Sequence, residues 1–310
     1  MTRSPVVLGL DFGGTKIALA VCDLGGTRLG TTTVESFPDD GASAAMGRAI
    51  AAGQALLETA APQGVLTAVG AATFGIPFDD RVELAPAIPG WEDLAFGREL
   101  KTAFPGVPVE LATDVKAAAQ AEARWGALVG CDPGLYLNLG TGLAAAIIVG
   151  GSVVTGAHRA AGEIGYNVRD VSDVGAPLAQ RITLEDVVSG KALAALASAE
   201  LGRPTTATQL FEQVASDPAA AALVDEFVRE LAMHVVNLAV AVDPARVVVG
   251  GGMVRSWARL APGLRSALDA AAPFSPELVT AEFPFDAPLI GALALGVEAA
   301  GAVLGEEALT

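Results

Sequence analysis

The sequence is poor in positive charge. Among its 310 residues, 19 Lys and Arg stand against 35 Asp and Glu, which gives a formal net charge of −16. Proteins that bind nucleic acid present a basic surface that neutralises phosphates, whereas the cations here are scattered singly along an acidic chain. We therefore expect no nucleic-acid partner.

The sequence also has little cysteine and histidine, two of each. Cys22 and Cys131 stand alone, so we expect neither a disulfide framework nor a thiolate metal site, and a reducing, cytoplasmic location is favoured. The amino terminus lacks the charged start, apolar stretch and cleavage site of a secretory signal. The apolar runs at 142–157 and 288–305 are too rich in Gly or too short, and Glu298 interrupts the second, so we expect no membrane span.

Gly and apolar residues are abundant, with 36 Gly and 52% hydrophobic residues. This composition and length predict an ordered globular protein of about two domains. In the first half, apolar runs between Gly-Gly turns predict three antiparallel strands, followed by alternating helices and strands in the order βββαβαβα. The strands are expected at 6–10, 17–21, 28–37, 67–74 and 107–111, and the helices at 41–61, 93–104 and 114–129.

The pattern restarts at Gly134. Strands are expected at 135–139, 144–149, 153–155, 246–249 and 277–283, and helices at 185–199, 218–242, 254–272 and 289–303. The segment Leu10 to Thr15 aligns with Leu137 to Gly142 at an offset of 127 residues. One Gly-rich hairpin resembles another by chance, but two with the same order of elements favour a duplicated α/β domain. A cleft between two such domains is a usual place for a small ligand.

Two Gly-rich turns could bind phosphate. The first, Asp11-Phe12-Gly13-Gly14-Thr15-Lys16, is neither a Walker loop nor the GxGxxG turn of a dinucleotide fold. Without Cβ atoms, Gly13 and Gly14 let backbone N–H groups approach phosphate oxygens, Thr15 adds a hydroxyl donor, and Asp11 can hold a hydrated Mg²⁺. Lys16 either approaches the phosphates or points to solvent. The second turn, Gly140-Thr141-Gly142, offers a similar cradle from the other half.

Further short motifs follow in order along the chain: Gly75-Ile76-Pro77, Ala85-Pro86 with Pro89-Gly90-Trp91, Thr113-Asp114, Ala161 to Gly165, Leu184-Glu185 with Ser189-Gly190, and Gly250 to Gly252. With the two Gly-rich turns, they make the chain resemble the ROK family of sugar kinases and repressors, within the actin, hexokinase and Hsp70 superfamily. It is most similar to a zinc-less variant of the bacterial glucokinase type. The resemblance implies an α/β fold of two ribonuclease-H-like (actin-like ATPase) domains with a nucleotide and sugar cleft between them. We expect a smaller domain of residues 1–116 plus 290–310 and a larger one of 117–289.

The resemblance also implies an activity and its residues. It predicts a kinase, dependent on ATP and Mg²⁺, that phosphorylates a free hexose or hexose derivative, typically at the 6-hydroxyl, with Asp114 as general base. Glu163 and Glu185 match glutamates that bind sugar hydroxyls, and Gly251 and Gly252 match the turn near the ribose and adenine. Alternative roles are an N-cap for Asp114, a solvated loop carboxylate for Glu163, a first-turn helix acid for Glu185, and an ordinary strand-to-helix turn for the glycines.

The chain departs from the family at a structural zinc site. Many members hold zinc with one His and three Cys, and the corresponding residues are Tyr166, Ala176, Leu178 and Thr183, which cannot coordinate it. We expect no zinc. We expect instead that apolar packing restabilises the loop, through five side chains: Ile164, Val168, Val171, Val174 and Leu178.

The acceptor pocket is altered as well. Tyr166 replaces a His that contacts the sugar, Ala87 replaces an Asn, and Thr113 replaces the Asn before the catalytic Asp. Since sites built to bind particular hydroxyls discriminate strongly when those groups change, we expect a modified hexose, such as an amino, deoxy or N-acyl sugar. Loss of the imidazole beside Glu163 leaves an acidic corner that suits an ammonium group.

Two other functions stay open. A non-catalytic sugar-binding regulator would keep the fold without turnover, although the intact Asp11, Asp114 and Gly-rich turns argue against degeneration. A chaperone-like or activator ATPase would lack the Glu163 and Glu185 motifs. With ten residues before Asp11, we expect no helix-turn-helix domain of the kind that ROK repressors carry. The family suggests a homodimer or higher homo-oligomer. We expect Trp91 to pack its loop and His234 to lie on a helix surface or, satisfied, in the core.

Overall fold

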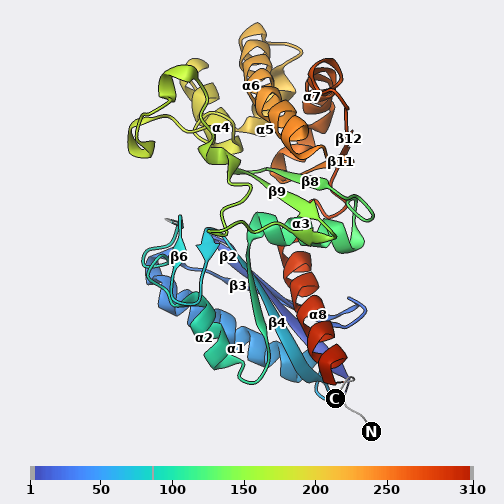
Figure 1. Cartoon of the computed structure of the whole chain (residues 1–310). Helices are drawn as coiled ribbons and strands as arrows, with labels where there is room; N and C mark the ends of the chain where they lie inside the picture. The colour runs from blue at the N-terminus through green and yellow to red at the C-terminus, as the bar shows by residue number, and fades with distance from the viewer. Residues whose placement is uncertain (1–3, 86, 308–310) are drawn as a thin grey trace. The chain divides into compact units, whose positions relative to one another are not determined.

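The computed structural model describes residues 4–85 and 87–307, with side chains as far as Gly305. The chain forms two compact units (Figure 1): unit 1 comprises Met1–Arg124 and Asp286–Thr310, and unit 2 comprises Trp125–Phe285. The boundaries expected from the sequence, after residues 116 and 289, fall inside helices α3 (Asp114–Trp125) and α8 (Ala287–Glu307). The structural division lies near the end of the first helix and just before the second.

Unit 1 is built on a five-stranded sheet in the order β3-β2-β1-β4-β7. Its first three strands pair antiparallel as expected from the Gly turns, while β1, β4 and β7 run parallel. The strands are β1 (Pro5–Phe12), β2 (Lys16–Asp23), β3 (Arg28–Glu35), β4 (Val65–Thr73) and β7 (Val109–Thr113). The three parallel strands end at one edge of the sheet.

Helices cover both faces of this sheet. Side chains alternate along β1, so Leu8, Leu10 and Phe12 enter a core with α1 (Ala42–Ala60) and α2 (Phe96–Ala103). Trp91 is buried in the same core, as expected: its ring stacks on Phe74 and its Nε1 donates to Thr73 Oγ1 at 3.1 Å. Helices α3 and α8 cover the opposite face through small residues.

Helix α8 is, within the described residues, the one helix long and apolar enough to cross a membrane. It packs against β4 and β1 as a core helix. A Cβ atom at Gly70 would lie 1.8 Å from the carbonyl oxygen of Ala292, and one at Gly291 would lie 1.8 Å from that of Ala117. The small residues of this apolar run therefore allow a close approach of the helix backbone to the sheet and to α3.

Unit 2 repeats the arrangement with the strand order β10-β9-β8-β11-β12, so the duplication inferred from the sequence is confirmed. The strands are β8 (Gly134–Leu139), β9 (Leu143–Val149), β10 (Ser152–Val153), β11 (Arg246–Gly250) and β12 (Glu277–Thr280). The helices are α4 (Gly190–Glu200), α5 (Ala207–Gln213), α6 (Pro218–Val242) and α7 (Trp257–Ala271), and they share one core with the sheet.

Local capping signals explain where the expectations succeed and where they miss. Helix α6 spans the expected 218–242 because Asp217 caps it and Pro218 is its first residue. Helix α4 begins at Gly190 rather than 185, since the Ser189 hydroxyl accepts the N–H of Ala192. Helix α5 and the small hairpin of β5 (Ile76–Pro77) and β6 (Val82–Glu83) were not expected.

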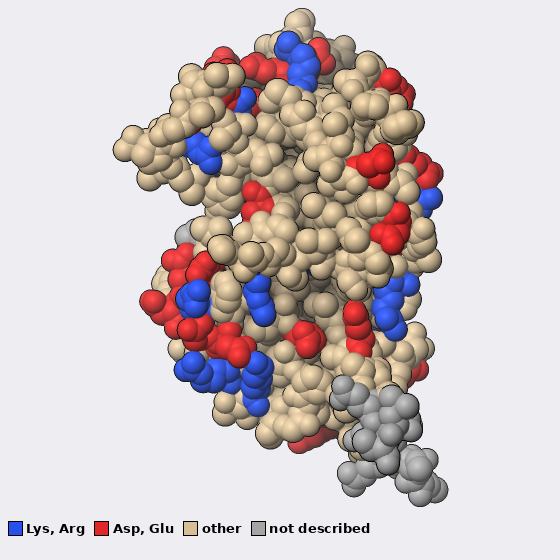
Figure 2. All heavy atoms as spheres, viewed as in Figure 1, with Lys and Arg blue, Asp and Glu red and all other residues tan. Residues whose placement is uncertain are grey.

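Acidic and basic side chains are interspersed on the face shown in Figure 2, where no continuous basic stripe is visible. This distribution matches the excess of Asp and Glu in the sequence.

Candidate active site

The candidate residues of unit 1 lie at the carboxyl ends of its parallel strands. Asp11 is the penultimate residue of β1, and Thr113 ends β7 opposite Thr73 of β4. Ligands of α/β sheets bind at these ends, where helix N-termini and loops gather. Asp114 follows directly as the first residue of α3. The tertiary structure therefore brings together two carboxylates that are about a hundred residues apart in sequence.

Asp11 has a strongly perturbed acidity. Burial is the largest cause and the negative charge of Asp114 is the next, and they raise the pKa of Asp11 from 3.8 to about 7. Lys16 lowers the pKa of Asp11, and Asp286 raises it further. Lys16 is exposed at the turn but close enough to act on this carboxylate. A buried carboxylate beside a second one is an arrangement that a bound cation would stabilise.

Thr113, rather than Asp114, is the N-cap residue of α3. The Oγ1 atom of buried Thr113 accepts the N–H of Lys116 at 3.2 Å, which is the usual cap bond to the third helical residue. Asp114 Oδ1 accepts the N–H of Val115 at 2.8 Å. The sequence allowed Asp114 an alternative role as the helix cap, and Thr113 takes that role instead. Since Asp114 is only half-buried, its carboxylate is accessible at the start of α3.

The first Gly-rich turn is held by a residue that sequence analysis missed. Gly13 N–H donates to the Lys16 carbonyl oxygen at 2.9 Å and closes the turn. Ser36, just after β3, donates from Oγ to the Gly13 carbonyl oxygen at 2.7 Å and from N–H to that of Thr15 at 2.9 Å. Only pairing of β2 with β3 brings Ser36 here, so no local sequence signal identifies it.

Ala87 also lies beside this turn. A Cβ atom at Gly14 would lie 4.0 Å from the Cβ atom of Ala87, which places Ala87 next to the turn. Ala87 is exposed, and the preceding Pro86, part of a motif used above, lies outside the described residues.

The second Gly-rich turn is held by a helix N-terminus. The carbonyl oxygens of Gly140 and Thr141 accept the N–H groups of Gly190 and Lys191, at 2.9 and 3.4 Å, at the start of α4. Glu185 approaches the same turn: its Oε2 accepts the N–H of Leu143 at 2.8 Å. A Cβ atom at residue 142 would lie 2.5 Å from that oxygen, so a larger residue there would require the Glu185 side chain to shift.

The loop that carries Glu163 lies against the same part of unit 2. The Gly162 carbonyl accepts the N–H of Ala145 at 2.8 Å, and the Gly165 carbonyl accepts the N–H of Glu185 at 3.0 Å. Glu163 is half-buried, and Tyr166 is 36% exposed. The structure therefore gathers Glu163, Glu185 and the second Gly-rich turn within one unit.

Gly251 and Gly252 differ in their surroundings. Gly251 has a φ of 87°, and a Cβ atom there would lie 2.5 Å from the Leu139 carbonyl oxygen, at the root of the second Gly-rich turn. At the exposed Gly252 a Cβ atom would meet nothing within 4 Å. The turn after β11 thus combines a sterically required glycine with one that faces open space.

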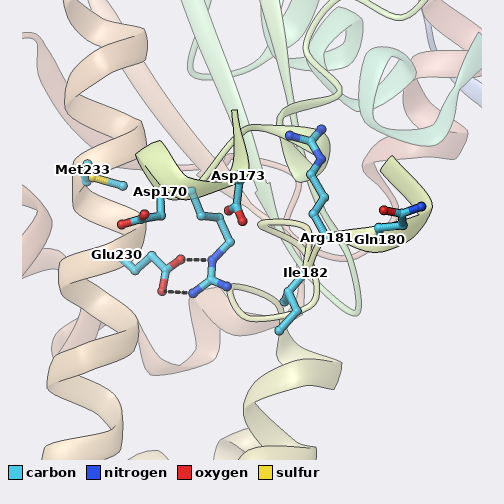
Figure 3. A pocket seen from close by; sticks show the side chains of 8 residues that line it. Asp170, Asp173, Gln180, Arg181, Ile182, Glu230 and Met233 are labelled. Carbon is cyan, nitrogen blue, oxygen red and sulfur yellow. Dashed lines mark hydrogen bonds and ion pairs between the residues drawn. The ribbon is translucent and has the colours of Figure 1, made fainter. Parts of the chain in front are cut away.

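The loop from 166 to 187 corrects an expectation. Of the five side chains expected to pack together, only Ile164 is buried; Val168, Val171, Val174 and Leu178 are 45 to 87% exposed. Polar contacts join the loop to its surroundings instead. Arg169 donates two hydrogen bonds to Glu230 of α6. Both residues line a pocket of about 510 Å³, in which Figure 3 labels Glu230.

Two further polar contacts join this loop. Arg181 Nη2 donates to the Tyr166 carbonyl oxygen at 2.7 Å, and Asn167 Nδ2 lies 3.3 Å from His234 Nδ1. His234 is 4% exposed, so it belongs to the core rather than the helix surface. Its Nε2 has no partner within the described residues, and burial lowers its pKa. The Asn167 contact satisfies only one of the two ring nitrogens.

The donor set suits Mg²⁺ rather than zinc. Among the described residues, no group of three or more His, Cys, Asp or Glu side chains could hold a metal ion. Mg²⁺ keeps several waters and binds through one or two carboxylates together with substrate phosphates. Asp11, beside Asp114 and a Gly-rich turn, fits such a loosely held ion.

Comparison with known proteins gives the family. The model of the ROK family matches residues 7–299. The chain belongs to the ROK family. Kanosamine kinase of Amycolatopsis mediterranei (strain S699) is 29% identical to it over 263 residues, or 84% of this chain and 85% of that protein.

Solved structures of ROK proteins share the fold. A ROK hexokinase from Thermus thermophilus has a TM-score of 0.81 at 31% identity. The match covers 97% of this chain and 99% of the hexokinase chain. A ROK family glucokinase from Streptomyces griseus, in complex with glucose and AMPPNP, has a TM-score of 0.73 at 28% identity. The match covers 94% of this chain and 99% of the glucokinase chain. The expected fold of two ribonuclease-H-like (actin-like ATPase) units is confirmed.

Proposed function

We propose that this ROK protein is a kinase, dependent on ATP and Mg²⁺, that phosphorylates a free hexose or hexose derivative at its 6-hydroxyl. The observation that carries the proposal is the state of Asp114. Thr113 caps α3, so the Asp114 carboxylate is left half-buried beside Asp11 at the carboxyl ends of the strands. The sugar kinases among its relatives support the same activity.

Asp114 would act as the general base. Phosphoryl transfer needs positioning, charge stabilisation and a carboxylate that accepts the proton of the attacking hydroxyl. Asp114 Oδ1 accepts the N–H of Val115, which orients the carboxylate that would accept the sugar proton.

The Gly-rich turns would bind the phosphates. In unit 1 the candidate phosphate-binding residues are Gly13, Gly14, Thr15 and Lys16. In unit 2 they are Gly140, Thr141 and Gly142. Asp11 would hold Mg²⁺ through water, and the ion would neutralise charge that develops on the phosphates. The raised pKa of Asp11 means that the cation must displace a proton at pH values below about 7. Gly251 and Gly252 would bind the nucleoside, with the open face of Gly252 toward it.

The acceptor would be a modified hexose. Glu163 and Glu185 of unit 2 would accept hydrogen bonds from its hydroxyls, and Thr113, Tyr166 and Ala87 are further candidate contacts to the sugar. Glu185 has one oxygen on the Leu143 N–H, which leaves the other for sugar. Two carboxylates without an imidazole favour an acceptor with an ammonium group, which makes amino sugars the first class to test.

The test is a coupled assay of ADP release with purified protein, across hexoses, amino sugars, N-acyl sugars and polyols, with ATP and with polyphosphate as donor. Release that requires both a sugar and Mg²⁺, followed by detection of the 6-phosphate, is expected. ADP release without sugar would indicate an ATPase. Sugar and nucleotide binding without any release would indicate the non-catalytic regulator.

We also propose that the chain forms a homodimer or higher homo-oligomer. The exposed apolar side chains of the 166–187 loop support this, because Val171, Val174 and Ile182 are 87, 71 and 61% exposed. Light scattering after gel filtration should give at least twice the 31.1 kDa chain mass. A monomeric mass at micromolar concentration would contradict the proposal.

A further inference from the structure

Ser36 contacts the first Gly-rich turn from within the fold. It is fully buried, with 0% of its surface exposed. Its Oγ donates to the Gly13 carbonyl oxygen at 2.7 Å, and its N–H donates to the Thr15 carbonyl oxygen at 2.9 Å. One residue therefore holds the carbonyl groups on both sides of Gly14.

These two bonds determine where the neighbouring N–H groups point. In a trans peptide, the C=O and N–H bonds point in opposite directions. Because the carbonyls of Gly13 and Thr15 are directed at Ser36, the N–H groups of Gly14 and Lys16 are directed away from it. N–H groups presented together by a Gly-rich turn form a concave surface that suits phosphate oxygens.

Arg48 of α1 holds Ser36 in turn. Thr15 and Ser36 are opposite each other in the continued β2–β3 register, where an antiparallel ladder would exchange two bonds. Among the described backbone bonds, only the one from Ser36 to Thr15 forms between them. Arg48 Nη2 donates to the Ser36 carbonyl oxygen instead, and its Nε donates to that of Glu35 at 3.2 Å.

Arg48 also stabilises the unusual backbone that follows. Phe37 has a φ of 43°, in the left-handed region that a bulky residue rarely adopts. The guanidinium carbon of Arg48 lies 5.1 Å from the centre of the Phe37 ring, and its Nη1 donates to Asp40 Oδ2 at 2.9 Å. The Arg48 side chain thus contacts four residues of the segment from 35 to 40: two through their backbone carbonyls, one through its ring and one through its carboxylate.

We infer that Ser36 and Arg48 are positioning residues for the nucleotide phosphates. Ser36 turns the amides of Gly14 and Lys16 toward the phosphate oxygens, and Arg48 holds Ser36 at the end of β3. Neither residue touches the ligand itself. The inference rests on the proposed nucleotide-binding function of the turn.

Two variants and two ligands test it. Calorimetry measures the dissociation constants of Mg²⁺–AMPPNP and of adenosine for the wild type, Ser36→Ala and Arg48→Lys. We expect Ser36→Ala to weaken AMPPNP binding about five- to tenfold, as for one lost hydrogen bond, with adenosine binding unchanged within twofold. Arg48→Lys keeps the charge but loses the fork, so a smaller weakening of the same pattern is expected. Ser43→Ala, at an exposed position of α1, is the matched control.

Turnover separates this inference from the kinase proposal. For Ser36→Ala, the KM for ATP should rise in the same proportion while the KM for sugar stays within twofold. Unchanged AMPPNP binding, or equal weakening of adenosine and AMPPNP, would overturn the inference. If Ser36→Ala weakens AMPPNP binding as expected but the wild type phosphorylates no sugar, only the kinase proposal is refuted.

Discussion

The two Gly-rich turns occupy the same place in two sheets of the same strand order, yet the fold holds them differently. In unit 1, Ser36 holds two carbonyls of the turn from a neighbouring strand. In unit 2, the N-terminus of α4 holds the carbonyls of Gly140 and Thr141, and Glu185 accepts the N–H of Leu143. Both arrangements fix carbonyls on one side of a turn, which leaves N–H groups free to face the other.

The strand position before each turn shows a second difference. Asp11 pairs with Ala18 in unit 1, and Asn138 pairs with Ala144 at the corresponding position of unit 2. Asp11 is a carboxylate whose pKa is raised by burial and then by the neighbouring Asp114, whereas Asn138 carries no charge. Since the pairing patterns match and the charges do not, the backbone turn belongs to the shared fold, and the proposed cation binding and proton transfer would depend on carboxylates of unit 1.

The largest effect is expected for Asp114→Asn. Loss of a general base lowers kcat by roughly a hundred- to ten-thousandfold, and Thr113 keeps the helix cap in the variant. Stopped assays should show this loss while thermal unfolding stays within about 2 °C of the wild type. Substantial remaining turnover would remove Asp114 from the mechanism, and with it the chemical distinction of unit 1.

The next largest effect is expected for Asp11→Asn, at roughly a hundredfold in kcat/KM for Mg²⁺–ATP. Wild-type activity should rise with pH through about 7, because the cation needs the carboxylate form of Asp11. Adding Asn138→Asp to Asp11→Asn should not restore activity. If it does, the two strand positions are interchangeable.

The same variant tests stability in the absence of ligand. The folded-state pKa of Asp11 is raised, so the folded protein binds the proton more tightly than the unfolded chain does. Its contribution to stability is therefore lost as pH rises from about 4 to about 7. Denaturation at pH 5 and pH 8 should show a smaller pH-dependent loss for Asp11→Asn than for the wild type, and equal losses would contradict the burial of this carboxylate.

Gly251→Ala should destabilise unit 2 by about 1–3 kcal/mol, because the positive φ and the Leu139 carbonyl both oppose a Cβ atom. Gly252→Ala is the matched control and should cost less than about 1 kcal/mol, since its Cβ atom meets open space. Urea unfolding measures both. Equal losses would mean that packing at the root of the second turn does not limit stability.

The smallest effect is expected for Glu230→Gln, which weakens the two bonds to Arg169. We expect about 1 kcal/mol of lost stability and a two- to fivefold higher KM for sugar, with an unchanged KM for ATP, because the loop carries Tyr166. Glu226→Gln, exposed one turn earlier on α6, is the control. A change in the KM for ATP instead would show that the loop does not serve the acceptor side alone.

Much of the fold could be predicted because its signals are local. The apolar runs and Gly turns predicted all ten strands of the two main sheets, and the helix expected at 218–242 has the bounds of α6. Helix α5 and the hairpin of β5 and β6 were missed, since their short segments carry little periodicity. The loop at 166–187 was expected to be apolar because its valines suggest packing, but its stability comes from ionic contacts to the distant α6.

The sequence by itself determined the two Gly-rich turns, the positions of Asp11 and Asp114, and the duplicated order of strands. These depend on neighbouring residues and on spacing along the chain. Only the tertiary structure decided that Thr113 caps α3, that Glu185 contacts the second turn, and that Ser36 and Arg48 hold the first. Each of these contacts depends on hydrogen-bond geometry of about 3 Å, or on residues brought together by strand pairing and helix packing, which spacing along the chain does not specify.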